Sequence, residues 1–189
     1  MSRPAAPTPP PADLAPERPS AVPATGQALR HALRDLASPV VVVTTETADG
    51  PRGATIGSFT SVSLDPPLVS VNVTHGTQLH TALAAAAEWA VHLLAADQAE
   101  VAVHFAVPDL DGEAQLAPFG HVRGPGPPLL RGSMGVLLCR AHARFEAGDH
   151  TVFVGEVTHV VEGAGTEPLL YYRQTYRTVS PSGEVRPGD

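Results

Sequence analysis

The sequence lacks lysine: its basic residues are all arginine, 12 against 19 acidic residues, which gives a formal net charge of −7. This absence excludes a Schiff-base lysine, a lysine general base and a phosphate-binding loop of the GxxxxGK[ST] type. An acidic chain with few cations is also a poor candidate for binding nucleic acid, whose phosphates are held mainly by Lys and Arg. We therefore expect neither lysine chemistry nor a nucleic-acid partner.

Cysteine and long apolar runs are also scarce. The only cysteine, Cys139, excludes an intramolecular disulfide and a Cys-rich metal site, and its setting in GVLLCRA predicts a buried structural thiol. No run approaches the roughly 18 apolar residues of a membrane span, and the first residues lack the apolar core of a signal peptide. We expect a cytoplasmic protein with no membrane partner.

Common catalytic and metal motifs are missing. The sequence contains no GxSxG, HExxH or CxxC, and Gly124-Pro125-Gly126 does not continue into a GxGxxG pattern. None of the nine histidines has a second histidine four residues away, the spacing that places two ligands on one helix face. We therefore expect no metal site.

What is present is one domain's worth of chain between two tails. The chain has 189 residues, and its hydrophobic fraction of 43% is sufficient for a core. Eight of the 20 prolines lie within residues 1–26, which predicts a disordered or polyproline-like tail. Residues 27–179 are expected to form the folded domain, and residues 180–189 a short C-terminal tail.

The hydrophobic pattern of the domain predicts a mainly β fold with short helices. Helices are expected over residues 27–37, 78–87 and 97–105, and a loop over 108–131. Strands are expected over residues 40–47, 53–63, 68–73, 89–94, 135–145, 150–161 and 169–172. The turn Ala147-Gly148-Asp149 joins the two longest strands into a hairpin. Long hairpins with inserted helices favour a β-barrel.

One region contains the kinds of residue that a binding site would need. Residues 53–73 concentrate small hydroxyl side chains and glycines between apolar strands, so backbone amides and hydroxyls are available to ring carbonyls or phosphate oxygens. Thr77 is expected to cap the next helix, whose N-terminus is suited to an anion. From these residues alone, two interpretations stay open: a site for a flat, phosphorylated heterocycle, or a Ser/Thr-rich edge strand followed by a capped helix.

Five segments together resemble the flavin reductase family, which includes the reductase components of two-component flavin monooxygenases. They are GATIGSFTSVSLDPPLVSVNV, TQLHTAL, WAVHLLAADQ, GDHTVFVGEV and PLLYYRQTY, and the resemblance covers residues 29–177. It implies a split β-barrel of the FMN-binding type, usually a homodimer. It also implies binding of FMN or FAD, hydride transfer from NADH or NADPH, and a flavin-dependent monooxygenase as partner.

The resemblance also implies site residues. The family's flavin contacts fall on Thr55, Ser58, Phe59, Thr60, Ser61, Asn72 and Val73, and its phosphate contacts on His75, Gly76, Thr77 and Gln78. The nicotinamide side falls on His150, Tyr172, Arg173 and Tyr176. Of these, His150 is the candidate catalytic residue, placed against the nicotinamide or donating to its amide or to the reduced flavin.

The phosphate loop departs from the family. Many members carry arginines there, whereas this chain has THGTQLH over residues 74–80. Because a charge-assisted contact contributes about 1.5–3 kcal/mol, losing arginines predicts weaker flavin binding. The departure leaves two alternatives: a pocket adapted to another reaction, including a non-redox one, or a flavin-binding protein without turnover. NADH is preferred over NADPH, because no arginine cluster suits a ribose phosphate.

Overall fold

The computed structural model describes residues 21, 23–108, 110, 112–165, 167–179 and 185–187. Most of the predicted N-terminal tail lies outside this part of the chain. The chain divides into two compact units, residues 1–33 and 34–189. In the first unit, helix α1 (Gly26–Leu33) buries none of its residues, and Thr25 Oγ1 accepts from the Ala28 N–H at 3.1 Å.

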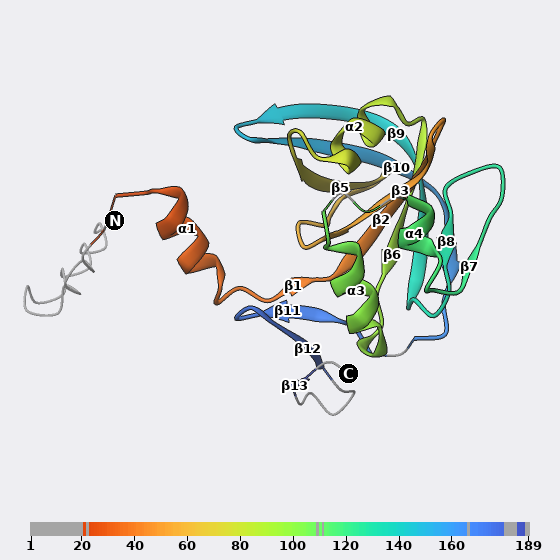
Figure 1. The fold of residues 1–189 in the computed structure, drawn as a ribbon. Helices are drawn as coiled ribbons and strands as arrows, with labels where there is room; N and C mark the ends of the chain where they lie inside the picture. The colour runs from red at the N-terminus through yellow and green to blue at the C-terminus, as the bar shows by residue number, and fades with distance from the viewer. Residues whose placement is uncertain are drawn as a thin grey trace, which may run out of the picture. The chain divides into compact units, whose positions relative to one another are not determined.

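A seven-stranded antiparallel sheet dominates the second unit, in the order β3-β2-β6-β9-β10-β5-β4 (Figure 1). Its strands are β2 (Val41–Thr47), β3 (Gly50–Ile56), β4 (Thr60–Leu64), β5 (Pro67–Thr74), β6 (Glu88–Leu93), β9 (Gly135–Ala147) and β10 (His150–Glu162). The β9–β10 hairpin turns at Gly148, whose φ of 67° lies in the left-handed region that glycine adopts without strain. The mainly β prediction, with a few short helices, is confirmed.

The expected barrel is not closed. β3 and β4 form the two edges of the sheet, and the strand ladders of the described residues do not join them. The predicted strand over 53–63 is in fact two strands, separated by residues 57–59. Ser58 in this connection bridges to β5, since its Oγ accepts from the Asn72 N–H at 2.9 Å and donates to the Asn72 carbonyl at 3.1 Å. This side-chain bridge links the β3–β4 connection to β5 without a strand ladder between β3 and β4.

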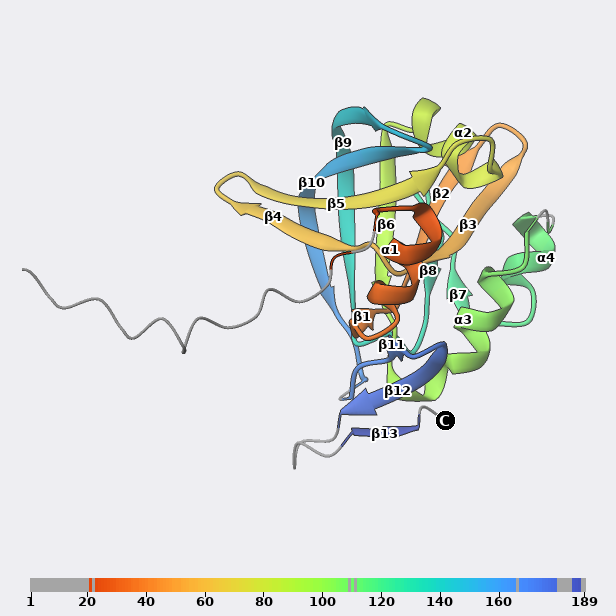
Figure 2. The same cartoon turned by 90° about the vertical axis from the view of Figure 1, so that its left-hand side faces the viewer.

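Smaller elements complete the unit (Figure 2). They are helices α2 (Gln78–Ala85), η2 (Ala96–Gln98), α3 (Ala99–Phe105) and α4 (Gly112–Leu116), strands β7 (His121–Val122) and β8 (Leu129–Leu130), and the sheet of β1 (Ser38–Pro39), β11 (Leu170–Tyr172), β12 (Thr175–Val179) and β13 (Val185–Pro187). The span 108–131, expected to be a loop, thus contains α4, β7 and β8. The span assigned to a C-terminal tail contains β13, which pairs with β12.

Strand β2 lies between two hydrophobic clusters, and this position explains its run of consecutive valines. Val41 and Val43 pack into one cluster, while Val42 packs into the other. A strand buried on both faces requires an uninterrupted apolar run, which is what VVVV provides. α2 contributes to the first cluster and α3 and α4 to the second. The space between α2 and α3, along β3, is where a cleft forms.

The single cysteine and the lengths of the helices can also be compared with the sequence. Cys139 is buried as predicted, and burial raises the pKa of its thiol to about 12, which disfavours a reactive thiolate. Across the described ranges, the structure contains no helix with the length and apolar character needed to cross a bilayer.

Candidate functional site

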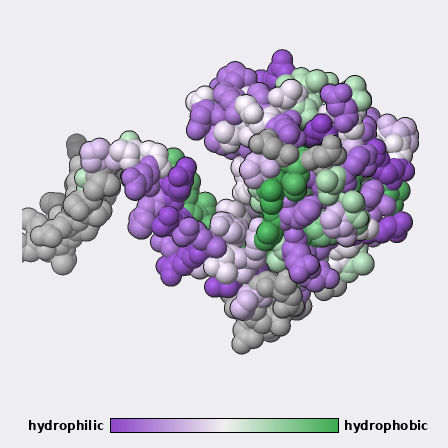
Figure 3. Space-filling model, in the orientation of Figure 1, coloured by the Kyte–Doolittle hydropathy of each residue, from purple (hydrophilic) through white to green (hydrophobic). Residues whose placement is uncertain are grey.

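A cleft of about 400 Å³ opens where β3, the end of β5, the start of α2 and the end of α3 meet. Its walls are Gly53, Ala54, Thr55, Ile56, Asn72, Val73, Thr74, Gly76, Thr77, Gln78, Leu79, Phe105, Ala106, Val107, Pro108 and Gln115. Figure 3 shows hydrophobic surface gathered in the region of α3. The cleft therefore combines an apolar side with a side of hydroxyls, amides and backbone groups, which suits a flat heterocycle with a polar edge.

The β3 wall is fixed by two side chains that bond to backbone. Gln115 of α4 is buried, and its amide accepts from the Gly53 N–H and donates to the Gly53 carbonyl, both at 3.1 Å. This pair of bonds continues the sheet at its edge. Thr55 Oγ1 donates to the Ala102 carbonyl of α3 at 2.7 Å. The hydroxyl proton of Thr55 is thus engaged within the protein, and its side chain sets the distance between β3 and α3.

The opposite end of the cleft is the start of α2. Thr77 caps this helix as predicted: its Oγ1 accepts from the His80 N–H at 3.2 Å and donates to the Thr74 carbonyl at 3.0 Å. The N–H groups of Gln78 and Leu79 belong to the first helical turn, which has no intrahelical acceptors for them. Gly76, with φ at 78°, makes the turn into the helix. This end offers backbone donors and a helix dipole to an anion.

No cation adds to those donors at the cleft. None of the wall residues is Arg or Lys. The nearest arginine in the sequence, Arg52, donates through Nη1 to the Pro51 carbonyl at 2.7 Å. The arginine missing from the sequence of the loop is therefore not replaced, in the described walls, by one from elsewhere in the chain.

The structure gathers six of the predicted site residues in the cleft wall: Thr55, Asn72, Val73, Gly76, Thr77 and Gln78. Four others lie along or just before the neighbouring edge strand: Ser58, Phe59, Thr60 and Ser61. Of these, Ser58 bridges to Asn72, Phe59 packs against the first hydrophobic cluster, and Thr60 and Ser61 pair with Ser70 and Val69 of β5.

His75 and His150 lie beside the cleft, outside its wall. His150 Nδ1 donates to Asp149 Oδ1 at 2.6 Å, because a carboxylate only accepts. His150 Nε2 lies 3.0 Å from Thr74 Oγ1, and Thr74 is a wall residue. The hydrogen bond from His150 Nδ1 to Asp149, and secondarily the charge of His150, lower the pKa of the Asp149 carboxyl. His75 points to the β9–β10 hairpin, where its Nε2 lies 2.9 Å from Glu146 Oε2.

The predicted nicotinamide residues Tyr172, Arg173 and Tyr176 lie on the β11–β12 hairpin and do not line the cleft. Arg173, at φ 48°, forms the turn, and its Nε contacts Asp35 Oδ1 at 2.6 Å. Its guanidinium carbon lies 5.3 Å from the centre of the Tyr172 ring. Tyr176 packs against the second hydrophobic cluster.

Sequence reasoning missed the α3 side of the cleft. Phe105, Ala106, Val107, Pro108 and Gln115 come from the end of one helix and from a segment expected to be loop. The apolar spacing of α3 did predict that helix. Nothing in the sequence indicated that Gln115 bonds to Gly53, 62 residues away.

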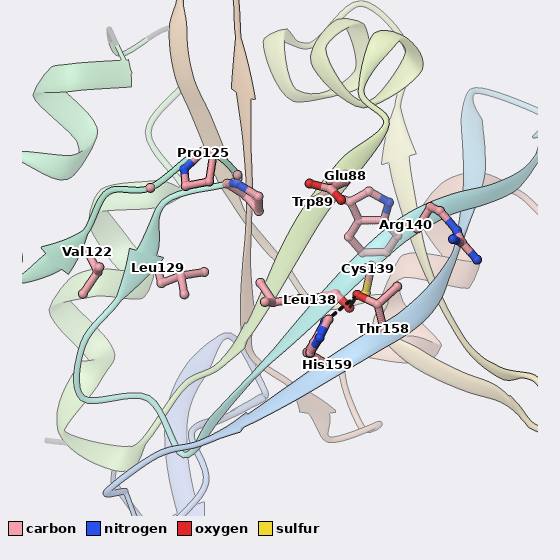
Figure 4. A pocket seen from close by; sticks show the side chains of 13 residues that line it. Glu88, Trp89, Val122, Pro125, Leu129, Leu138, Cys139, Arg140, Thr158 and His159 are labelled. Carbon is pink, nitrogen blue, oxygen red and sulfur yellow. Dashed lines mark hydrogen bonds between the residues drawn. The ribbon is translucent and has the colours of Figure 1, made fainter.

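A second pocket, of about 420 Å³, lies between β6, β9, β10 and the connection that follows β7 (Figure 4). Trp89, Leu129 and Leu138 provide much of its apolar wall, with Glu88 and Arg140 in one part of it and Thr158 and His159 in another (Figure 4). It contains none of the predicted site residues.

The sequence and the fold both match one family. Residues 33–180 match the flavin reductase like domain, so the chain belongs to this family. A relative from Streptomyces pristinaespiralis, NADH:riboflavin 5'-phosphate oxidoreductase, is 42% identical over 88% of this chain and 94% of its own length. The reductase component of 4-hydroxyphenylacetate 3-monooxygenase from Thermus thermophilus is 36% identical over 80% of this chain and 95% of its own.

Solved structures give the same grouping. The chain is similar to the NADH:FAD oxidoreductase of Streptomyces globisporus C-1027, solved in complex with NAD and FAD fragments, with a TM-score of 0.76 and 37% identity. That similarity covers 82% of this chain and 93% of the other. The expected family is thus confirmed.

Proposed function

We propose that this chain is an NADH-dependent flavin reductase that transfers hydride to FMN or FAD and supplies reduced flavin to a separate monooxygenase. The observation that carries the proposal is the cleft, which brings β3, the end of β5 and the first turn of α2 together at one place. The named activities of the relatives support the chemistry, and the monooxygenase component among them supports the partner.

The cleft residues fit a flavin. β3, with the hydroxyl oxygen of Thr55, and the end of β5, with Asn72, would face a flat ring, and Phe105 and Val107 would supply an apolar side. The first-turn N–H groups of Gln78 and Leu79 suit a phosphate. A bound flavin accepts hydride at its ring directly from a nicotinamide, so the protein has to align two rings and stabilise charge rather than exchange protons. This requirement agrees with a sequence that lacks acid–base motifs.

The chemistry of the phosphate end predicts that flavin behaves as a diffusing substrate. Backbone N–H groups and a helix N-terminus attract an anion, but each charge-assisted arginine bond that is missing removes about 1.5–3 kcal/mol of binding. A weakly held flavin leaves after reduction. That behaviour is what transfer to a separate oxygenase requires.

His150 is proposed to act on the nicotinamide side, next to the cleft wall at Thr74. Its Nδ1–H is held by Asp149, which fixes the ring and leaves the Nε2 edge toward Thr74. We expect His150→Ala to lower kcat/KM for NADH roughly 10- to 100-fold, in the range of one lost hydrogen bond to a polar or charged group. Unchanged NADH turnover in this variant would remove His150 from the mechanism.

Tyr172, Arg173 and Tyr176 are part of the same proposal, on the nicotinamide side. Because they lie outside the cleft wall, an NADH molecule that reached them would extend beyond the cleft.

We also propose that the protein is a homodimer and that it is located in the cytoplasm. Light scattering during size-exclusion chromatography tests the dimer by a mass twice that of the 19.6 kDa chain.

Steady-state NADH oxidation tests the function itself. The purified chain is mixed with NADH and FMN, FAD or riboflavin, and absorbance at the nicotinamide band is followed with and without oxygen. We expect turnover that depends on flavin concentration. Tight flavin binding without NADH oxidation would indicate a flavin-binding protein, and no flavin binding would indicate an adapted pocket.

A further inference from the structure

Thr151 is the centre of a hydrogen-bond network next to the cleft, and it is not one of the wall residues. It lies on β10, opposite Val73 of β5 and Glu146 of β9, and it is 1% exposed. Its hydroxyl is within hydrogen-bond distance of three side chains: His75 Nε2 at 3.0 Å, His80 Nε2 at 2.9 Å and Glu146 Oε1 at 3.1 Å. One buried hydroxyl thus joins two histidines and a carboxylate.

The count of donors and acceptors assigns a direction to each bond. A hydroxyl has one proton, and a carboxylate only accepts, so Thr151 donates to Glu146. The two lone pairs of the hydroxyl then accept from His75 and His80, and both histidines carry a proton on Nε2. The Nε2–H of His75 also reaches Glu146 Oε2 at 2.9 Å. Each of the three bonds of the Thr151 hydroxyl thus has one donor and one acceptor, and the Nε2 proton of His75 is shared between Thr151 and Glu146.

The two histidines flank the anion end of the cleft. His75 directly precedes Gly76, and its backbone N–H donates to the Asp149 carbonyl at 3.0 Å. His80 lies in the first turn of α2, where its own N–H is capped by Thr77. The stretch between them includes Gly76, Thr77 and Gln78, which line the cleft. Thr151 therefore holds both ends of this stretch against the β9–β10 hairpin while lying outside the cleft wall.

We propose that Thr151 is a positioning residue for flavin phosphate: through His75 and His80 it fixes residues 76–79, so that their N–H groups stay directed at the anion. The inference rests on the proposed function, since it names how this chain orients the backbone donors that would hold the flavin phosphate. A preorganised set of amides binds an anion better than a mobile one, because no ordering cost is paid on binding. His75 then serves the phosphate indirectly, by holding the loop.

The test compares Thr151→Val, which removes the hydroxyl at similar size, with Thr151→Ser, which retains it. Thr45→Val is the matched control, because Thr45 is also buried and donates to the Glu88 carbonyl, outside the cleft wall. We expect Thr151→Val to raise the KM for FMN about tenfold, with kcat and the KM for riboflavin close to wild type. Thr151→Ser restores the FMN value, and Thr45→Val leaves it unchanged.

Equal KM values for FMN in Thr151→Val and wild type would overturn the inference, as would equal rises for FMN and riboflavin. If Thr151→Val does not fold, His80→Leu, which removes one donor of the network, replaces it in the test. An unchanged KM for FMN, or equal rises for FMN and riboflavin, in this variant would likewise overturn the inference. Amide hydrogen exchange of flavin-free protein separates this inference from the proposed function. Faster exchange over residues 75–80 in Thr151→Val, but not in Thr45→Val, supports the positioning role even if wild type shows no turnover, and unchanged exchange contradicts it.

Discussion

Two pockets of this protein, the cleft beside β3 and the pocket beside Trp89, are nearly equal in volume, about 400 and 420 Å³, but differ in what forms their walls. The cleft beside β3 is lined by backbone, small side chains and a helix start. The pocket beside Trp89 and Leu138 has a largely apolar wall, and Trp89 and Cys139 in that wall also belong to the first hydrophobic cluster. Size therefore does not distinguish them, and wall chemistry does.

The difference in wall chemistry also predicts different effects of substitutions at the two pockets. Groups at the start of α2 have unused hydrogen-bonding capacity, so changes there alter ligand affinity more than folding. Trp89 and Cys139 in the apolar pocket are 2% exposed, so changes around them alter packing. Variants at the cleft should change flavin KM, and variants at the apolar pocket should change stability. Kinetics and unfolding of variants at the two pockets test that separation.

The largest effect is expected for Thr77→Asp. Aspartate caps a helix as well as threonine does, so α2 is retained, but a negative charge then faces the flavin phosphate. We expect the KM for FMN to rise about a hundredfold, close to 3 kcal/mol, from lost attraction and added repulsion. Steady-state kinetics measure it.

Riboflavin, which lacks the phosphate, is the control for this variant and should keep its KM. Thr77→Ser should behave as wild type with both flavins. A rise of the same size for FMN and riboflavin would show that the phosphate does not lie at this end of the cleft.

A substitution at Gly155, next to the Trp89 wall of the apolar pocket, should lower stability and leave the KM for FMN unchanged. A Cβ at Gly155 would collide with the Trp89 ring and lie 2.9 Å from Cys139 Cβ, so the packed residues must move. We expect Gly155→Ala to lower the free energy of unfolding by about 1–3 kcal/mol, the usual cost of overpacking. Urea unfolding measures this change. FMN turnover by the remaining folded protein should be normal, and a specific rise in FMN KM would break the comparison.

The smallest effect is the one expected near pH 6 at His92, which supports the same pocket. His92 is fully buried, donates through Nε2 to Thr44 Oγ1 at 3.0 Å, and burial lowers its pKa to about 3. Thr44 in turn donates to the carbonyl of Pro128, next to two pocket residues. Below about pH 6.5 the unfolded chain binds a proton at this histidine and the folded chain does not. Stability therefore falls with decreasing pH.

For this one group the loss is about 1.4 kcal/mol per pH unit between its unfolded and folded pKa values. His92→Gln keeps a donor for Thr44 and removes the titration. Unfolding free energies at pH 7.5, 6 and 5 should therefore depend less on pH in this variant. An identical pH dependence in the two proteins would contradict the buried neutral state.

Local pattern predicted more of the fold than of the site. The apolar run of β2, the β9–β10 hairpin and the Thr77 cap are consequences of neighbouring residues, and all three were predicted. The division of residues 53–63 into β3 and β4 was not, because it depends on Ser58 meeting Asn72 across the sheet. Likewise α4 is too short for a periodic signal, and its place depends on the contact between Gln115 and Gly53.

The same limit applies to the candidate residues. Thr55, Asn72 and the Gly76–Gln78 stretch could be placed together from the resemblance, and they share the cleft. That His75 faces Glu146 instead of the cleft depends on the length and register of the β9–β10 hairpin. The role proposed for Thr151 depends on the same register and could not be inferred from sequence.

A crystal structure of the protein with FMN tests the central claim most directly. The account predicts the flavin ring between β3 and the end of β5, with its phosphate at the N–H groups that begin α2. Flavin bound instead in the pocket of Trp89 and Leu138, or with its phosphate away from residues 76–79, would contradict it.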